Sequence, residues 1–315
     1  MAHRPRIALT LGDPAGIGPE IVLKALEQRA LLQRMHLVLL GPEQLRPAAI
    51  ALLAEGQPVG ELELSWCATA APDPWVVGQI QASAGRAALA ALYRGSEMGL
   101  AGQIDALVTA PVSKEALHLA GEKVEGQTQL LGRLAQTPVE MMAIAGKLRV
   151  LLLTRHVPLR AALDAIRSEA VVHHLNVLND GLKRMGFERP KLALAGLNPH
   201  AGERGILGHE ELEILEPALR EVRAQGLDVS GPLPPDTVFL RASRGEFDGV
   251  LALYHDQAFI PVKLAAPTSG LTVLLGLPYL RVSPTHGTAF DIAGKGLADA
   301  TNLILALEQA VEWSS

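Results

Sequence analysis

The sequence predicts an α/β protein built on a mainly parallel or mixed β-sheet. Short apolar runs alternate with helix-length amphipathic segments along almost the whole chain. The apolar runs are nearly continuous in their hydrophobicity, as strands must be when helices cover both faces of a sheet. Hydrophobic residues make up 49% of the 315 residues and aromatic residues only 3%, so the core must consist of aliphatic side chains. This length suits one large α/β enzyme or two coupled domains.

Each expected strand is a short apolar run, and several are followed by a polar or Gly/Pro turn. The expected strands are residues 6–11, 37–40, 106–109, 150–154, 192–195, 249–254 and 271–275. Apolar positions three and four residues apart predict helices between them. These helices are residues 19–33, 79–98, 127–136, 168–185 and 208–225, with a closing helix at 301–311. Residues 231–236 (GPLPPD) come nearest to a linker and are expected to form only a loop.

Composition excludes several classes of protein. A chain this apolar is not disordered, since disordered chains lack the apolar surface that offsets chain entropy. The sequence contains no run of about 18 uninterrupted apolar residues, so we expect no transmembrane helix. Asp13 interrupts the N-terminal segment too early for that segment to contain the apolar region of a signal peptide. The single cysteine, Cys67, excludes an internal disulfide and a cysteine-based zinc site. A net charge of −5 argues against a nucleic-acid surface, and we expect a cytoplasmic enzyme.

A glycine-rich turn follows the first expected strand. It reads Gly12-Asp13-Pro14-Ala15-Gly16-Ile17-Gly18-Pro19-Glu20. The glycines allow close backbone approach, and Pro19 suits the first turn of the next helix. The turn lacks the Lys-Ser/Thr of a P-loop and the glycine spacing of a dinucleotide turn. It is therefore either a ligand-binding turn or a tight connection between strand and helix.

Three histidines, His156, His200 and His255, follow three separate expected strands. Ligands of open α/β sheets bind outside the carboxyl ends of the strands. Three neutral imidazoles there could hold Zn²⁺ or a related ion and leave one coordination position for substrate. The alternative is that each is an ordinary turn or core histidine. The other histidines are expected at the terminus or facing solvent from helices; they are His3, His36, His118, His173, His174 and His209.

Three charged residues lie near the ends of expected strands or helices. Asp236 follows GPLPP and is expected to cap a helix that begins there, although an acid, a base or a metal ligand are alternatives. Lys263 and Arg281 are either solvated surface charges or an anion clamp for phosphate or carboxylate.

Seven segments spread over nearly the whole chain carry a family resemblance. They are LTLGDPAGIGPEI (9–21), TAPVSK (109–114), TRHVPL (154–159), LNPHAGE (197–203), GPLPPDT (231–237), YHDQ (254–257) and GLPYLRVSPTHGTAFDIAGKG (276–296). In this order they resemble the 4-hydroxythreonine-4-phosphate dehydrogenase family, with paralogues such as terephthalate dihydrodiol dehydrogenase. The last segment is also similar to the cofactor loop of isopropylmalate and isocitrate dehydrogenases.

The resemblance implies a two-domain fold like that of isocitrate and isopropylmalate dehydrogenases. The active site would lie in the cleft between the domains, at the interface of a homodimer. We expect residues 1–110 with 270–315 to form the cofactor-side domain. Residues 111–269 are expected to form the domain for metal, substrate and dimerisation.

The resemblance also implies the roles of individual residues. His156, His200 and His255 would bind one divalent ion, Zn²⁺, Mg²⁺ or Co²⁺. An anionic substrate would contact Gln127, Thr128, Lys263, Thr272 and Arg281, with Asp236 and Lys263 as catalytic groups. His286, Gly287, Thr288 and Asp291 would line a site for NAD or NADP.

The implied reaction oxidises a secondary alcohol with NAD(P)⁺ and then releases the adjacent carboxylate as CO₂. The metal would act as a Lewis acid on the hydroxyl, and the cofactor would perform the redox step. Other classes left open are a binding module that has lost the chemistry and a metal-dependent hydrolase or acyltransferase.

Two positions depart from the family pattern. Gln127 stands where the family has a substrate-binding His, and Thr272 stands where it has an Asn. Because Gln cannot carry a positive charge, the anion end of the pocket loses a potential cation. The expected substrate is 4-phosphohydroxythreonine. The alternatives are a terephthalate cis-dihydrodiol, which needs no phosphate pocket, and threonate or erythronate 4-phosphate.

Overall fold

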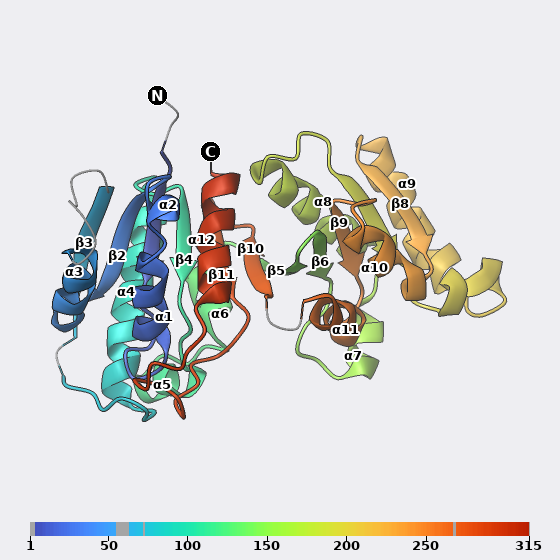
Figure 1. The fold of residues 1–315 in the computed structure, drawn as a ribbon. Coiled ribbons are helices and arrows are strands. Elements are labelled where there is room, and N and C mark those ends of the chain that lie inside the picture. Colours follow the sequence, from blue (N-terminus) through green and yellow to red (C-terminus); the bar gives the residue numbers. More distant parts are fainter. Residues whose placement is uncertain (1–3, 55–62, 72, 267–268, 315) are drawn as a thin grey trace. The chain divides into compact units, whose positions relative to one another are not determined.

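The computed structural model describes residues 4–54, 63–71, 73–266 and 269–314. The α/β class with a mixed sheet is confirmed, and Figure 1 shows its helices and strands. The chain divides into two compact units. Unit 1 comprises Met1–Val139 and Leu277–Ser315, and unit 2 comprises Glu140–Gly276.

The strands of unit 1 are all parallel, in the order β3-β2-β1-β4-β11. They are β1 (Arg6–Thr10), β2 (His36–Pro42), β3 (Glu63–Thr69), β4 (Ala106–Thr109) and β11 (Leu280–Pro284). The helices are α1 (Gly18–Leu26), α2 (Arg29–Leu32), α3 (Arg46–Ala54), α4 (Ala82–Leu100), α5 (Lys114–Leu119), α6 (Gln127–Leu134) and α12 (Thr301–Trp313), with the short turn η1 (Glu43–Leu45). Helices α4 and α12 pack against the central strands, so β1 and β4 are buried along almost their whole length.

Unit 2 has a mixed sheet in the order β10-β5-β6-β9-β7-β8. Its strands are β5 (Glu140–Ala145), β6 (Leu148–Leu152), β7 (Lys191–Ala195), β8 (Asp228–Leu233), β9 (Gly249–Ala252) and β10 (Leu271–Leu275). Its helical segments are α7 (Leu159–Ala165), α8 (Ser168–Arg184), η3 (Pro199–Gly205), η4 (Glu211–Leu215), α9 (Glu216–Ala224), α10 (Pro235–Ser243) and α11 (His255–Ala265). Strands β6, β9 and β7 are adjacent and parallel. Their carboxyl ends therefore lie at one edge of the sheet.

All seven expected strands overlap strands of the structure, but two edge strands, β3 and β8, were not predicted. Strand β3 lies at an edge of the sheet of unit 1 and is only half-buried, so it lacks a continuous apolar run. Strand β8 lies at an edge of the sheet of unit 2 and includes Gly231 and Pro232, which were expected in a loop. An edge strand tolerates such residues because one side of its backbone needs no partner.

Further strands and helices also differ from the prediction. Strands β5 and β11 were not expected, since Glu140, Arg281 and Ser283 interrupt their apolar pattern. The single helix expected at 19–33 is two helices, α1 and α2. His174, expected to face solvent, is only 8% exposed because it lies on the buried face of α8 with Val171 and Leu175.

Residues 111–139, assigned by the sequence to the second domain, belong to unit 1 in the structure. Helices α5 and α6 follow β4 and pack against α4. Leu89 and Leu92 of α4 share a buried cluster with Leu117 of α5 and Leu130 of α6. Among the described residues, no helix combines the length and apolarity needed to cross a bilayer.

Candidate active site

Two of the three candidate metal ligands meet in unit 2. His156 follows β6, and His255 begins α11 shortly after β9; their ring centroids are 5.7 Å apart. Thr154 Oγ1 donates to Leu253 O at 2.9 Å, which ties the loop of His156 to that of His255. The two imidazoles are thus close enough to bind the same metal ion.

The His156–His255 pair opens into a cavity of about 340 Å³ that is also lined by Thr154, Tyr254 and Asp256. His255 Nδ1 lies 2.7 Å from Asp256 Oδ1, an arrangement that orients the ring. The ring of Phe259, one turn further along α11, packs against His255 at 4.6 Å. Within one chain, the described residues contain no group of three or more His, Cys, Asp or Glu arranged to hold a metal.

His200 lies in η3, the loop after β7, where it is exposed. Residues 200–204 all have positive φ, and four of them are not glycine. A left-handed conformation costs roughly 1–2 kcal/mol for each such residue. The surroundings of this loop must therefore hold it in place.

Buried Gln257 connects the loop of His255 with the start of the loop of His200. Its Oε1 accepts from Leu253 N at 2.7 Å, and its Nε2 donates to Gly196 O at 2.8 Å. The amide oxygen and the amide nitrogen of Gln257 thus each bond to backbone just beyond the ends of the neighbouring strands β9 and β7. This side chain sets the spacing of the two loops.

Asp236 does not cap α10, contrary to the sequence prediction. Pro234 is the N-cap and Pro235 the first helical residue, so Asp236 lies two positions beyond the capping position. Its exposed carboxylate in the first turn still faces the positive end of the helix dipole. It lines a cavity of about 610 Å³ with Tyr254 and Asp256.

Lys263 and Thr272 also belong to unit 2. Lys263 is exposed on α11, with Nζ 5.9 Å from the ring centroid of Phe259. Thr272 is buried in β10, opposite Ala143 of β5.

Arg281, on β11 of unit 1, is a buried cation with neutral partners. Only 3% of the residue is exposed. Its Nη2 donates to Thr109 Oγ1 at 2.6 Å and to Gln127 Oε1 at 3.0 Å. Burial lowers the pKa of Arg281 to about 10, and its Nε has no hydrogen-bond partner in the described part of the chain. Such a charge calls for an anion.

Gln127 is held from both ends of its amide. Besides accepting from Arg281, it donates through Nε2 to Ala110 O at 3.2 Å. Thr128 follows it in the first turn of α6 and is half-buried. The residue that replaces the family His therefore orients the guanidinium of Arg281.

The expected cofactor loop, which contains His286, Gly287, Thr288 and Asp291, lies against the glycine-rich turn. Thr288 O accepts from Ile17 N at 2.9 Å, and a Cβ on Gly16 would come within 2.9 Å of Thr288. Gly287 and Asp291 are exposed. His286 Nε2 is buried without a partner among the described residues.

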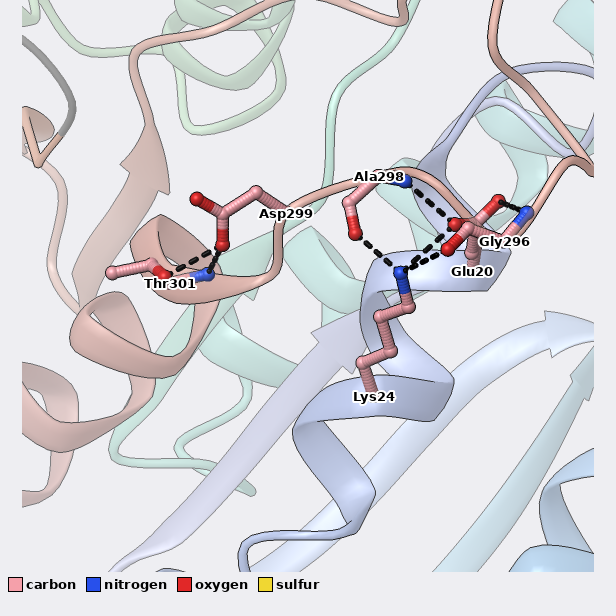
Figure 2. A network of polar contacts seen from close by, with 6 residues as sticks. All are labelled: Glu20, Lys24, Gly296, Ala298, Asp299 and Thr301. Carbon is pink, nitrogen blue, oxygen red and sulfur yellow. Dashed lines mark hydrogen bonds and ion pairs between the residues drawn. The ribbon is translucent and has the colours of Figure 1, made fainter.

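Two charged residues of α1 hold the far end of this loop (Figure 2). Glu20 accepts from Gly296 N at 3.2 Å and Ala298 N at 2.7 Å. Lys24 Nζ donates to Gly296 O, Ala298 O and Glu20 Oε1. Although burial opposes it, these donors lower the pKa of Glu20.

Asp13, in the glycine-rich turn, is fully buried. Its Oδ1 accepts from Ala15 N at 3.0 Å, whereas Oδ2 has no partner among the described residues. Burial raises the pKa of Asp13 from its ordinary 3.8 to about 6, against the opposing effect of backbone hydrogen bonds. This carboxyl is therefore easily protonated.

The sequence of this chain also matches a known protein family. The model of the family described as "Pyridoxal phosphate biosynthetic protein PdxA" matches residues 21–310. The chain belongs to the PdxA family.

PdxA relatives align over nearly the full length of this chain. A D-threonate 4-phosphate dehydrogenase of Salmonella typhimurium is 41% identical, covering 97% of this chain and 98% of that protein. The D-threonate 4-phosphate dehydrogenase of Cupriavidus necator is 40% identical, covering 98% and 97%. The 4-hydroxythreonine-4-phosphate dehydrogenase of Desulforapulum autotrophicum is 37% identical, covering 98% and 95%.

Solved structures agree with this PdxA assignment. A 4-hydroxythreonine-4-phosphate dehydrogenase from Burkholderia phymatum has a TM-score of 0.86 and 38% identity, covering 99% of this chain and 98% of that one. A terephthalate 1,2-cis-dihydrodiol dehydrogenase from Burkholderia xenovorans has a TM-score of 0.74 and 31% identity, covering 98% of each chain. A β-decarboxylating dehydrogenase from Thermococcus kodakarensis shares the fold, with a TM-score of 0.54 and 15% identity over 96% of this chain and 82% of that one. This chain is thus a PdxA-type dehydrogenase.

Several residues of this PdxA chain make contacts around the candidate site that the sequence did not predict. Glu20 and Lys24 are spaced four apart on a helix, a pattern that usually indicates only a surface ion pair. Gln257 was visible within the YHDQ segment, but its buried amide contacts were not. Glu211 carried no signal in the sequence, because its partners lie in another loop.

Proposed function

We propose that this chain oxidises the secondary alcohol of a phosphorylated four-carbon hydroxy acid with NAD(P)⁺ and releases its carboxylate as CO₂. The observation that carries the proposal is the buried guanidinium of Arg281 with two neutral partners. A buried charge is stable only when an opposite charge compensates it. A phosphate or carboxylate of the substrate would supply that charge.

A phosphorylated substrate is favoured by the relatives as well. The relatives that are 37% to 41% identical bear the names of enzymes for phosphorylated acids. The terephthalate dihydrodiol dehydrogenase is 31% identical. We place D-threonate 4-phosphate ahead of 4-phosphohydroxythreonine, the substrate expected from the sequence, because relatives of 41% and 40% identity carry the former name. The two acids differ at C2, in a hydroxyl against an amino group.

The metal would be held by His156, His255 and His200. The observed His156–His255 pair supplies two imidazoles, and the contact with Asp256 leaves Nε2 of His255 available once Nδ1 carries the proton. When bound, the metal would polarise the alcohol oxygen and the nicotinamide would accept the hydride. Thr154 connects the loops of His156 and His255, and Gln257 connects the loops of His255 and His200, so the three histidine loops are held together for this task.

Asp236 and Lys263 would exchange protons with the substrate. On α11, the ring centroid of Phe259 lies 4.6 Å from that of His255 and 5.9 Å from Nζ of Lys263, so Lys263 is close to the candidate metal ligand. Gln127 and Thr128 would complete the anion site around Arg281 as hydrogen-bonding groups. Thr272, buried in β10, would contact the substrate only through its hydroxyl.

The dinucleotide would bind along His286, Gly287, Thr288 and Asp291. A Cβ on Gly287 would meet nothing within 4 Å, so the backbone there is open to a ligand. The contacts from Ile17, Glu20 and Lys24 support this loop without covering Gly287.

We also propose a homodimer with the metal site shared between subunits. One chain offers no three-ligand group among its described residues, so a second copy would complete the coordination. Leu240, Ile260 and Leu264 of α10 and α11 are 53%, 59% and 77% exposed beside the larger cavity. Clustered exposed aliphatic side chains of this kind mark protein interfaces.

Following nicotinamide reduction by absorbance tests the reaction. The assay contains NAD⁺ or NADP⁺, a divalent ion and one of four acids: D-threonate 4-phosphate, erythronate 4-phosphate, 4-phosphohydroxythreonine or a terephthalate dihydrodiol. We expect reduction together with CO₂ release from a phosphorylated acid. Turnover of the dihydrodiol alone would refute the proposed substrate class. Product without nicotinamide reduction would indicate a hydrolase or transferase instead.

A further inference from the structure

The loop that carries His200 is strained at consecutive residues. The φ angles are 53° at His200, 54° at Ala201, 76° at Gly202, 43° at Glu203 and 56° at Arg204. Only glycine adopts this region without penalty. Strain of this kind persists only where neighbouring groups hold the backbone, and it concentrates at functional sites.

One buried carboxylate holds the entry to this loop. Glu211, on η4, is only 3% exposed. Its Oε1 accepts from Leu197 N at 2.8 Å and from Asn198 N at 2.7 Å. Its Oε2 accepts from Asn198 Nδ2 at 2.8 Å. Three donors therefore converge on one acceptor group directly before the left-handed residues.

The same carboxylate also lies close to the backbone of the strained residues themselves. A Cβ on Gly202 would come within 2.7 Å of Glu211 Oε2, so the loop wraps closely around the carboxylate. Asn198 Nδ2 additionally donates to Glu210 Oε2 at 2.8 Å. Since its oxygens already accept from these three donors and it is buried, Glu211 is poorly placed to contact a metal or substrate itself.

We infer that Glu211 is a positioning residue that presents His200 for metal binding. This inference rests on the proposed function, in which His200 is a metal ligand. Glu211 acts through the backbone of Leu197 and Asn198, the residues that lead into the strained turn. Without its charge-assisted hydrogen bonds the turn would relax toward right-handed backbone and carry the imidazole of His200 away.

The test is Co²⁺ binding to the full chain, measured by calorimetry and by the visible absorption of the bound ion. Glu211→Ala should weaken Co²⁺ affinity about 10- to 100-fold, the range typical of lost outer-shell support. Glu211→Gln keeps one oxygen for the two backbone amides and should lose less. Glu213→Gln removes the same charge from an exposed side chain of the same segment and should bind Co²⁺ like the unmodified chain. His200→Ala serves as the reference for a lost ligand.

Amide hydrogen exchange distinguishes positioning from general destabilisation. We expect exchange at Leu197 and Asn198 in the Glu211 variants to increase by more than any increase at the amides of β6, β7 and β9, because the loss of support is local to this loop. Unchanged Co²⁺ affinity in both Glu211 variants, with affinity lost in His200→Ala, would overturn the inference and leave the proposed function standing. Full Co²⁺ affinity in His200→Ala would overturn both. If Glu211→Ala does not fold, an unchanged affinity in Glu211→Gln would still refute the inference.

Discussion

Arg281 Nη2 donates to Gln127 Oε1 at 3.0 Å, so a neutral amide faces the buried guanidinium on β11. The sequence alone indicated that Gln127 removes a cation from the anion pocket. The structure adds that Gln127 supplies an acceptor that keeps the guanidinium in one orientation. Within the described part of the chain the guanidinium has no negatively charged partner, and the first prediction follows from this.

Arg281→Met should lower kcat/KM for the phosphorylated substrate by about 30-fold or more, because losing one member of a buried charge pair costs about 2–5 kcal/mol. The ligand-free protein should keep its free energy of unfolding or gain some, since an uncompensated buried charge is removed. Steady-state kinetics and urea unfolding measure the two effects. The control Arg220→Met alters an exposed arginine and should change neither. Unaffected kinetics in Arg281→Met would show that the anion binds elsewhere.

Gln127→His should leave kcat/KM for a phosphorylated substrate intact or raise it. A neutral imidazole can still accept from Arg281, and its protonated form, populated below about pH 6.5, adds a charge that favours a phosphate dianion. The gain should therefore grow as the pH falls through that value. Gln127→Leu, which lacks both polar groups, should raise KM. If Gln127→His instead lost activity on the phosphorylated acids, the result would support a cyclic dicarboxylate as the substrate.

Asp13→Asn should stabilise the protein at neutral pH. The pKa of Asp13 is raised from 3.8 to about 6, so the folded state binds the extra proton between these values and stability falls as the pH rises through them. Above about pH 6 the full cost is about 3 kcal/mol. The amide variant should remove most of this loss and match the unmodified chain near pH 4. Urea unfolding from pH 4 to 8 measures it.

Asp228→Asn provides the matched control for Asp13→Asn. Asp228 is exposed at the start of β8, so the same change of charge should leave the pH profile of stability unaltered. Equal profiles for Asp13→Asn and Asp228→Asn would contradict the role of burial.

Lys24→Met should weaken NAD(P) binding by roughly tenfold or more, since charge-assisted hydrogen bonds to the loop are lost. Lys24 contacts the carbonyl oxygens of Gly296 and Ala298, at the far end of the loop that contains Thr288. Fluorescence titration gives the Kd, and hydrogen exchange reports on the amides of residues 296 and 298. Lys24→Arg should retain most of the affinity. Glu27→Gln, an exposed change at the end of α1, is the control, and an equal effect there would argue against the contact.

His156→Ala and His255→Ala should each reduce Co²⁺ affinity strongly, and the double variant should bind little worse than either single one. Ligands of one ion act as a unit, so their losses do not add. The observed separation of 5.7 Å between the rings is the basis for this coupling. Strictly additive losses would mean that the two histidines act independently.

Local sequence pattern was sufficient for the fold class and for seven of the strands. Buried strands such as Ala106–Thr109 and Leu271–Leu275 were predicted with their observed bounds, because covering both faces requires a continuous apolar run. The edge strands β3 and β8 were missed because an edge imposes no such pattern. The positions of His156 and His255 just after strands were visible for the same local reason.

The sequence by itself determined which residues follow the strands, and only the tertiary structure decided which of them meet. Strand order placed β6 beside β9, which brings His156 to His255. It likewise placed β11 beside β4, which carries Arg281 to Thr109. The hydrogen bonds that Glu211 accepts from Leu197 N and Asn198 N, at the start of the His200 loop, likewise depend on tertiary packing. Hydrophobic periodicity records whether a segment is buried, but pairing depends on contacts between residues far apart in the chain.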